Sequence, residues 1–337
     1  MPEMRELLSW IGKMPRSKAQ LNGLNESDCE LIRLGKSKTL AVTVDSLSDE
    51  MEVGLYRDPF TIGWMTGAIS LSDLSASGAS PLGVLASNTW GGETLEAKKS
   101  YADGLRALLK KTGVAHLGGD SGQGRAAVHS AVALGLIEGK TVSRVGIEPG
   151  DVIAYAGTLG PGPALGFKLL LGRNESVLSE NDYRPLPKLR EGAAARELAS
   201  AMMDTSDGLL TTLYTLSNLN GVGFELEWNE KWIHPKAAGF CREAGLPLSS
   251  LLFGEHGDYQ LLIAVPEKKW PALKKKVPSV FPLGRAVKGR QMTLRDRAGP
   301  KYSLPVTEVQ NLSRTSLVDI LKAFETVVGF LREAGAP

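Results

Sequence analysis

Cysteine is scarce in this chain: Cys29 and Cys241 are the two among 337 residues. Two cysteines exclude a disulfide framework, and they offer no spacing typical of zinc ligands. The first 18 residues hold no continuous apolar core of the signal-peptide type. No run approaches the roughly 20 apolar residues that a membrane-spanning helix needs. We therefore expect a protein of the reducing cytoplasm without a membrane partner.

Neither positive nor negative charge is in large excess. Lysine and arginine number 39 against 37 aspartates and glutamates, so the formal net charge is +2. A nucleic-acid partner would call for a broad basic surface, so we expect none, and the lysines between residues 268 and 276 fit a solvated helix face. Apolar residues make up 42% and charged residues 23%, the balance of a globular protein whose length allows about two domains.

Strand-like and helix-like segments alternate along the chain. In the first half we expect a helix from Asp58-Pro59 to about 77, a helix at 93–112, strands at 39–47, 81–90 and 126–138, and a strand end at 116–119 that leads into a glycine-rich turn. In the second half we expect strands at 152–157, 222–228 and 258–265, and helices at 164–172, 191–201, 207–219 and 316–334. This alternation predicts α/β or α+β architecture.

Aspartates recur at the ends of these segments or beside small residues, namely Asp28, Asp45, Asp73, Asp120, Asp204 and Asp207. Each adjoins an apolar stretch, where an unpaired carboxylate is costly to bury. Mg²⁺ prefers hard oxygen ligands and often joins carboxylates to substrate phosphates, so convergence on one cleft would suit a metal–nucleotide site. Taken singly, each has a simpler explanation, such as a helix cap for Asp204 or Asp207 or a tight turn around Asp120.

The wording around these aspartates is specific. SLSDLSASGA, HLGGDSGQG and MMDTSDGL occur in this order. They resemble the NLSDLAAMGA, VGGDTTRG and AIDISDGL segments of the thiamine-monophosphate kinases. Further similar segments, from about residue 23 to about residue 265, are VTVDSL, SRVGIEPGDVI, RPLPKLREG, GVGFEL and GDYQLL. The chain thus resembles the thiamine-monophosphate kinase family, whose superfamily includes aminoimidazole ribonucleotide synthetase and selenophosphate synthetase.

The resemblance implies a two-domain fold of the aminoimidazole ribonucleotide synthetase type. We expect an N-terminal ATP- and Mg²⁺-binding domain over 1–146, a C-terminal domain over 147–305 and a helical extension over 306–337. The N-terminal sheets are expected to pair across a homodimer, and the strand at 39–47 is apolar on both of its faces. The implied reaction is direct transfer of the γ-phosphate of ATP to a small phosphorylated metabolite, with positioning and charge neutralisation as the main protein tasks.

The resemblance also assigns residues by position. Those that match metal-binding positions are Asp28, Thr43, Asp45, Asp73, Asp120, Asp204 and Asp207. Those that match ATP contacts are Gly119, Asp120, Arg144 and Ser206. An arginine suits a polyphosphate because its planar fork pairs with two oxygens.

The acceptor half of the pattern is altered. Glu52 stands there where the family has a histidine, and outside that half Ser27 replaces the first aspartate of the family's GDD motif. The GGEDYEL segment has become GEHGDYQL, so Glu52, His256 and Asp258 are the candidate acceptor residues. We expect the acceptor to be thiamine phosphate or a related compound, and the altered half favours a related one. Alternatives are an ATP-dependent enzyme that activates an amide or carbonyl oxygen, and a nucleotide-binding relative without turnover.

Overall fold

The computed structural model describes residues 6, 9–173, 177–295, 301–310 and 317–333. Its strands are β1 (Glu30–Arg33), β2 (Lys38–Ser46), β3 (Ser80–Trp90), β4 (His116–Gln123), β5 (Val128–Glu138), β6 (Val152–Ala156), β7 (Ala201–Asp204), β8 (Val222–Glu227), β9 (Leu261–Val265), β10 (Phe281–Lys288), β11 (Met292–Arg295) and β12 (Lys301–Ser303). Its α-helices are α2 (Ser48–Glu52), α3 (Pro59–Ser77), α4 (Leu95–Thr112), α5 (Pro161–Leu170), α6 (Leu189–Ala195), α7 (Leu209–Asn220), α8 (Pro235–Ala244), α9 (Trp270–Lys276), α10 (Val306–Gln310) and α11 (Leu317–Glu333). Short 3₁₀ turns are η1 (Glu180–Asp182), η2 (Glu230–Trp232), η3 (Leu248–Phe253) and η4 (Glu267–Lys269).

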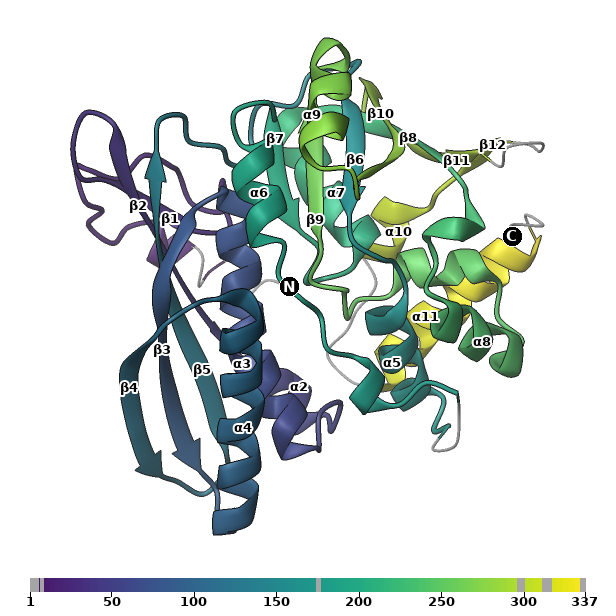
Figure 1. Cartoon of the computed structure of the whole chain (residues 1–337). Helices are drawn as coiled ribbons and strands as arrows, with labels where there is room; N and C mark the ends of the chain where they lie inside the picture. Colours follow the sequence, from purple (N-terminus) through teal and green to yellow (C-terminus); the bar gives the residue numbers. More distant parts are fainter. Residues whose placement is uncertain (1–5, 7–8, 174–176, 296–300, 311–316, 334–337) are drawn as a thin grey trace.

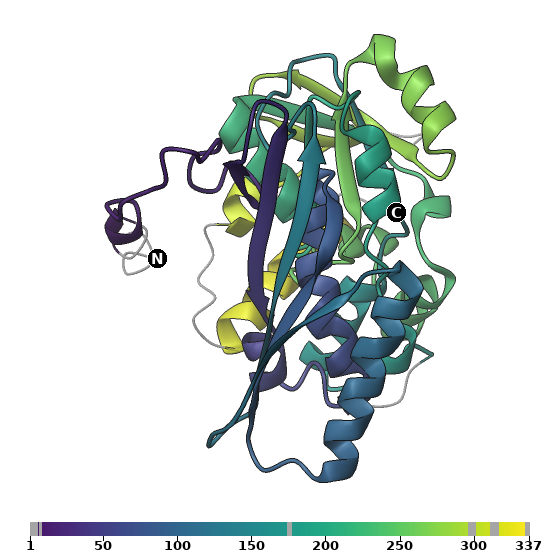
Figure 2. The same cartoon turned by 60° about the vertical axis from the view of Figure 1, so that its left-hand side comes forward.

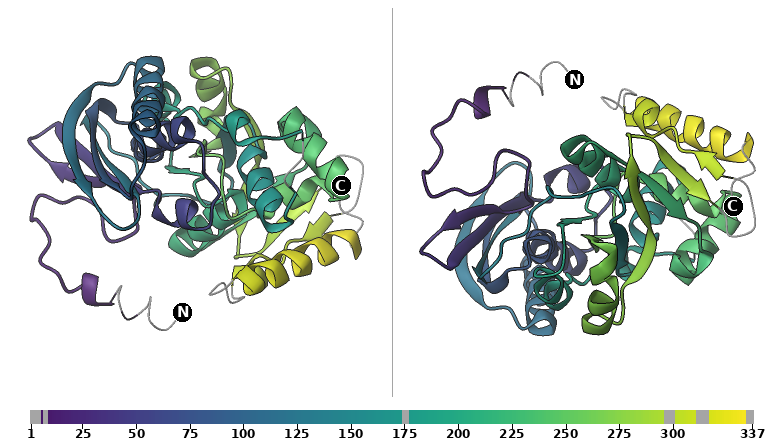
Figure 3. Two further views of the ribbon diagram at one scale, coloured as in Figure 1. Left: turned by 90° about the horizontal axis from the view of Figure 1, so that it is seen from below. Right: turned by 90° about the horizontal axis from the view of Figure 1, so that it is seen from above.

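The first half of the chain builds a five-stranded sheet in the order β1-β2-β5-β3-β4. The pair β3–β4 is parallel and the other pairs are antiparallel. Helices α3 and α4 lie together against one face of this sheet (Figure 1). The second half builds a seven-stranded sheet in the order β12-β11-β8-β10-β6-β9-β7. The two halves lie side by side (Figure 3), and the expected α/β architecture with two sheets is confirmed.

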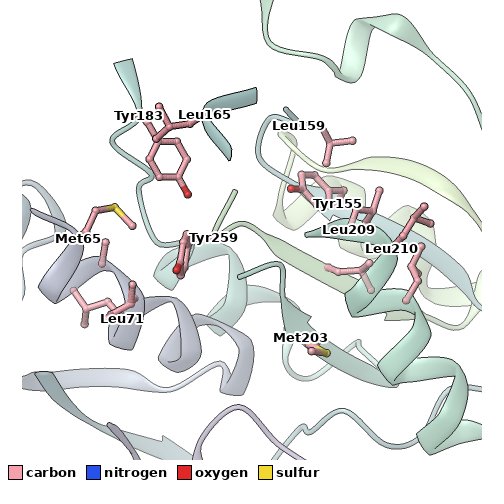
Figure 4. Close-up of a cluster of buried hydrophobic side chains, with 14 of the residues drawn as sticks. Met65, Leu71, Tyr155, Leu159, Leu165, Tyr183, Met203, Leu209, Leu210 and Tyr259 are labelled. Atoms are coloured by element: carbon pink, nitrogen blue, oxygen red, sulfur yellow. The ribbon is translucent and has the colours of Figure 1, made fainter. Parts of the chain in front are cut away.

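Helix α3 is the central element of the fold. The side chain of Asp58 accepts a hydrogen bond from the Thr61 N–H, Pro59 occupies the first turn, and Gly78 ends the helix with φ 65°. Of its 19 residues 16 are buried, because it packs against the sheet on one side and against β7 and α6 of the second half on the other. Figure 4 shows its Met65 and Leu71 in the same buried cluster as Tyr259 of the second half.

Glycines allow α3 to approach its neighbours closely. A Cβ on Gly63 would lie 1.9 Å from the carbonyl oxygen of Tyr101 in α4, and one on Gly104 would lie 1.9 Å from that of Phe60. On the other side, a Cβ on Gly192 of α6 would lie 2.0 Å from the carbonyl oxygen of Ser75. The small residues of α3 thus serve helix contacts on two sides.

The outer face of the first sheet is apolar and uncovered. Because side chains alternate along a strand, Val44 and Val128 lie on the face opposite to α3, and they are 69% and 40% exposed. Half-buried residues on this face are Leu40, Val42, Val132, Leu134 and Leu136. Figure 2 looks toward this side of the molecule, and within the described ranges no element lies over it. The expectation that the strand at 39–47 is apolar on both faces is correct for the outer face and wrong for the inner face, where Thr39, Thr43 and Asp45 accompany Ala41.

Two element predictions are wrong. The expected glycine-rich turn after 119 is strand, because residues 118–123 continue β4 in register with β3. The helix expected at 191–201 ends at Ala195, and Ala201–Asp204 form β7, which pairs with β9. The start of the helix expected at 316 lies outside the described residues. The domain boundaries at 146 and 305 stay predictions. In the part of the chain that the structure describes, no helix is both long and apolar enough to cross a membrane.

Candidate functional site

Three carboxylates from distant segments meet where the two halves join. Asp28 precedes β1, Asp73 lies in α3 and Asp204 ends β7. One oxygen of each lies within 4.8 Å of the other two. Asp204 is buried, and Asp28 and Asp73 are half-buried. Burial of α3 against both halves therefore brings together three of the predicted metal-binding residues.

Polar neighbours hold these carboxylates in place. The Thr43 hydroxyl donates to Asp73 Oδ2 at 2.6 Å, and the Ser72 hydroxyl donates to Asp204 Oδ2 at 2.6 Å. The Ser206 hydroxyl donates to Asp204 Oδ1 at 3.2 Å. Thr43 and Ser206, which the sequence assigned to metal and ATP contacts, therefore lie directly against the cluster.

Arg144 is the cation of the site. Its Nη2 pairs with Asp28 Oδ1 at 2.8 Å, and its Nη1 donates to the Asn25 carbonyl. Burial opposes its charge, but Asp28, with Asp204 and Asp73, outweighs burial and raises the pKa of Arg144. The guanidinium therefore stays charged at the edge of the carboxylate cluster.

The cluster carries more negative charge than one arginine offsets. Burial, then the nearby Asp204 and Asp28, raise the pKa of Asp73 well above its ordinary value. Burial, followed by Asp28, likewise raises the pKa of Asp204. Asp45 and Asp207 form an adjoining pair, and burial first raises the pKa of both. Such a group of hard oxygens fits a divalent cation, which would offset the repulsion.

Two buried polar atoms beside the cluster lack partners. Ser27 Oγ and Arg144 Nε are buried, and among the described residues neither has a hydrogen-bond partner. Both residues adjoin Asp28, by sequence for Ser27 and by ion pair for Arg144. Buried polar atoms are normally satisfied, so a bound oxygen ligand, such as a phosphate or a metal-bound water, fits this corner of the site.

Asp120 lies apart from the other predicted metal ligands of the same chain. It pairs with Ser87 on the outer face of the sheet, whereas Asp45 shares the inner face with Ala131. Between β2 and β4 stand β5 and β3, so about 14 Å separates the two positions across the sheet. The sequence resemblance grouped all six aspartates, but one chain brings together five of them.

A cavity of about 710 Å³ lies between α4 and the inner face of β3 and β4. Its wall includes Gly119 and Asp120, two of the predicted ATP contacts. Aromatic and polar side chains, Trp90, Tyr101, Asn88 and Ser121, line it, and Lys98, Arg106 and Lys110 add positive charge. A Cβ on Gly119 would lie 1.8 Å from the carbonyl oxygen of Ala86, so glycine is required for the close pairing of β3 and β4.

The structure places the three candidate acceptor residues, Glu52, His256 and Asp258, in different surroundings. Glu52 ends α2 with an exposed side chain. Glu50, two residues earlier, is half-buried, and the charges that face it include Asp45 and Asp207. Burial, then these carboxylates, raise its pKa. The sequence analysis did not single out Glu50. Its place in the short helix that follows Asp45 was the available signal.

His256 lies inside an aromatic cluster. The Tyr56 hydroxyl and His256 Nε2 are hydrogen-bonded at 2.8 Å, and the rings of Tyr183 and Tyr259 lie 5.1 and 6.1 Å from the imidazole. Burial lowers the pKa of His256 to about 3, so the ring is neutral. Tyr259 has φ 49°, a conformation that non-glycine residues rarely adopt and that often marks functional segments.

Asp258 anchors a loop. Its two carboxylate oxygens accept the N–H groups of Gly160 and Gly162 at 2.7 and 2.8 Å at the start of α5. Burial raises its pKa to about 7, although both N–H groups favour the charged form. Both oxygens are thus engaged within the chain, and a direct acceptor contact stays a prediction.

Comparison with known proteins agrees with this geometry. Residues 26–137 match the family model for AIR synthase related protein, N-terminal domain. Thiamine-monophosphate kinase of Methanospirillum hungatei is 30% identical over 277 residues, 81% of this chain and 90% of that protein. The enzyme of Salmonella typhimurium is 30% identical over 255 residues, 73% of this chain and 77% of that one.

A solved structure of AaThiL complexed with AMPPCP and TMP has the same fold. Its TM-score is 0.74 with 24% sequence identity, covering 90% of this chain and 98% of that one. The fold is therefore shared over nearly the whole length. Given the 30% identity across most of both sequences, the chain belongs to the thiamine-monophosphate kinase family.

Proposed function

We propose that this chain transfers the γ-phosphoryl group of ATP to a phosphate of thiamine phosphate or a related acceptor, with Mg²⁺. The observation that supports this proposal most directly is that carboxylate oxygens of Asp28, Asp73 and Asp204 lie within 4.8 Å of one another beside Arg144. Phosphoryl transfer needs charge neutralisation and in-line positioning, which carboxylate-held Mg²⁺ and an arginine fork supply. The relatives named as thiamine-monophosphate kinases support the choice of acceptor.

Different residues serve the nucleotide base, the metal ion and the phosphates. We place the base and ribose of the nucleotide in the cavity beside α4, whose wall includes Gly119. Asp28, Asp73 and Asp204 would hold Mg²⁺, and Thr43 and Ser72 orient two of these carboxylates through hydrogen bonds. Arg144 neutralises phosphate charge at the same corner. When bound, Mg²⁺ supplies charge stabilisation to the phosphates.

Product analysis tests the proposal. The purified protein is incubated with Mg²⁺, ATP and thiamine phosphate, and the products are separated. Thiamine diphosphate with ADP supports the kinase. ADP with orthophosphate supports activation of an amide or carbonyl, and absence of turnover with every phosphorylated acceptor supports a binding protein. Asp73→Asn should abolish turnover, whereas Glu227→Gln, which removes one negative charge from an exposed side chain at the end of β8, should leave it unchanged.

We further propose a homodimer in which Asp120 serves the site of the partner. The outer sheet face is apolar, with Val44 69% exposed, and such a face favours burial against a second copy. Asp120 lies on this face, away from the cluster of its own chain. Pairing of two sheets would bring it toward the other copy.

Mixed dimers test this arrangement. Asp73→Asn and Asp120→Asn are each expected to inactivate the enzyme when present in both copies. Coexpressed together, they should restore about a quarter of the activity, because half of randomly formed dimers are mixed and each has one intact site. If both residues serve the site of their own chain, the mixture stays inactive and the arrangement is wrong.

A further inference from the structure

Within the part of the chain that the structure describes, the side chain of Asn88 in the cavity beside α4 forms hydrogen bonds through its oxygen and none through its nitrogen. The Tyr101 hydroxyl donates to Asn88 Oδ1 at 2.6 Å, and His129 Nδ1 lies 3.0 Å from the same oxygen. Because a carbonyl oxygen only accepts, this contact requires the His129 tautomer that carries its proton on Nδ1. Two donors therefore fix the orientation of the amide.

The amide nitrogen of Asn88 faces the cavity. Among the described residues no acceptor takes a hydrogen bond from Asn88 Nδ2, and this atom is not one of the buried polar atoms that lack a partner. Because Asn88 lines the cavity, its Nδ2 is open to whatever the cavity holds. The cavity thus presents a donor with two hydrogens at a fixed position.

The residues around Asn88 make this position rigid. The rings of Trp90 and Tyr101 lie 4.9 and 4.6 Å from the ring of His129. Trp90 Nε1 donates to the Ser121 hydroxyl at 2.8 Å, which ties β3 to β4 at this point. His129 is buried, and burial lowers its pKa, so it stays neutral beneath the amide. A rigid donor discriminates between ligands because a mismatch leaves it unpaired.

We infer that Asn88 reads the nucleotide base, donating from Nδ2 to an unprotonated ring nitrogen of a purine. The inference rests on the proposed function, which places the nucleotide in this cavity. Aromatic side chains and the aliphatic part of α4 supply apolar surface for a flat ring, and Asn88 supplies the polar contact. Asn88 is thus a specificity-determining residue for the nucleotide.

The test is a double-mutant cycle that combines a change of the Asn88 side chain with changes of the ring nitrogens of the nucleotide. Asn88→Asp keeps an acceptor for Tyr101 and His129 but replaces the donor by a carboxylate oxygen. Asn218→Asp, on the exposed face of α7, makes the same chemical change away from the cavity and is the matched control. Binding of Mg·ATP and of its 1-deaza, 3-deaza and 7-deaza analogues is measured by calorimetry for the wild type and both variants.

We expect Asn88→Asp to weaken ATP binding about tenfold, the loss of one hydrogen bond, with Asn218→Asp unchanged. One of the three analogues should bind the wild type about tenfold more weakly than ATP, and this analogue alone should show no further loss with Asn88→Asp. Losses that add for all three analogues, or unchanged ATP binding by Asn88→Asp, would overturn the inference. The wild-type measurements with the analogues need no variant to fold. Failure of the wild type to bind ATP at all would instead overturn the proposed function.

Discussion

Changing Asp73 to asparagine removes one charge from the carboxylate cluster and keeps the shape of the side chain. In the wild type its oxygen lies within 4.8 Å of those of Asp28 and Asp204. Two unit charges at 4.8 Å repel by about 3 kcal/mol at an effective dielectric constant of about 20. Arg144 and solvent offset part of this repulsion, so we expect the metal-free variant to gain about 1–2 kcal/mol in unfolding free energy near pH 8.

The gain should depend on pH. Burial and the neighbouring carboxylates raise the folded-state pKa of Asp73 above its unfolded value. The folded state then holds the proton more tightly, so stability is full below the unfolded pKa of about 4 and is lost as the pH rises through the folded-state pKa. Metal-free wild type should therefore lose stability as the pH rises above about 4, and Asp73→Asn should lose less.

Urea unfolding in the presence of a chelator, at about pH 5 and about pH 8, measures both effects. Adding Mg²⁺ should then stabilise the wild type, because a ligand that binds the folded state raises its unfolding free energy, and should stabilise Asp73→Asn much less. Glu227→Gln controls for the change in net charge. If Asp73→Asn is no more stable than the wild type near pH 8 and gains equally from Mg²⁺, the three carboxylates do not form a metal site.

Three further predictions concern other parts of the molecule. Val44→Lys, on the exposed sheet face, should shift the mass in light scattering from dimer to monomer, and a monomeric wild type would refute the dimer. Asp258→Asn should lower the unfolding free energy by about 1–3 kcal/mol in urea titrations, because Asn cannot accept from both N–H groups at the start of α5; an unchanged midpoint would contradict this. Glu50→Gln should raise the KM for thiamine phosphate, a cationic acceptor, by about threefold or more without changing ATP affinity, and Glu52→Gln should change neither; the reverse pattern would restore Glu52 as the acceptor residue.

The sequence alone determined those features that neighbouring residues decide. Asp58, Pro59 and Gly78 mark the two ends of α3, because caps and turn conformations act within a few residues. The motif resemblance grouped Asp73 with Asp204, and the structure brings them together. The motif resemblance also predicted the fold and the family correctly, because ordered motifs spread over most of the chain constrain both.

Tertiary structure decided which face each side chain occupies. Successive residues of a strand point to opposite faces, so the β3–β4 register, and not the GGD motif, puts Asp120 on the outer face. On α2, residues two apart point about 200° apart, which leaves Glu52 exposed and turns Glu50 toward Asp45. The glycine run at 118–119 became strand because β3 supplies its hydrogen-bond partners. The partner of each strand, and the sheet face on which each side chain lies, depend on segments far apart in the sequence. Short motifs therefore do not predict the strand register.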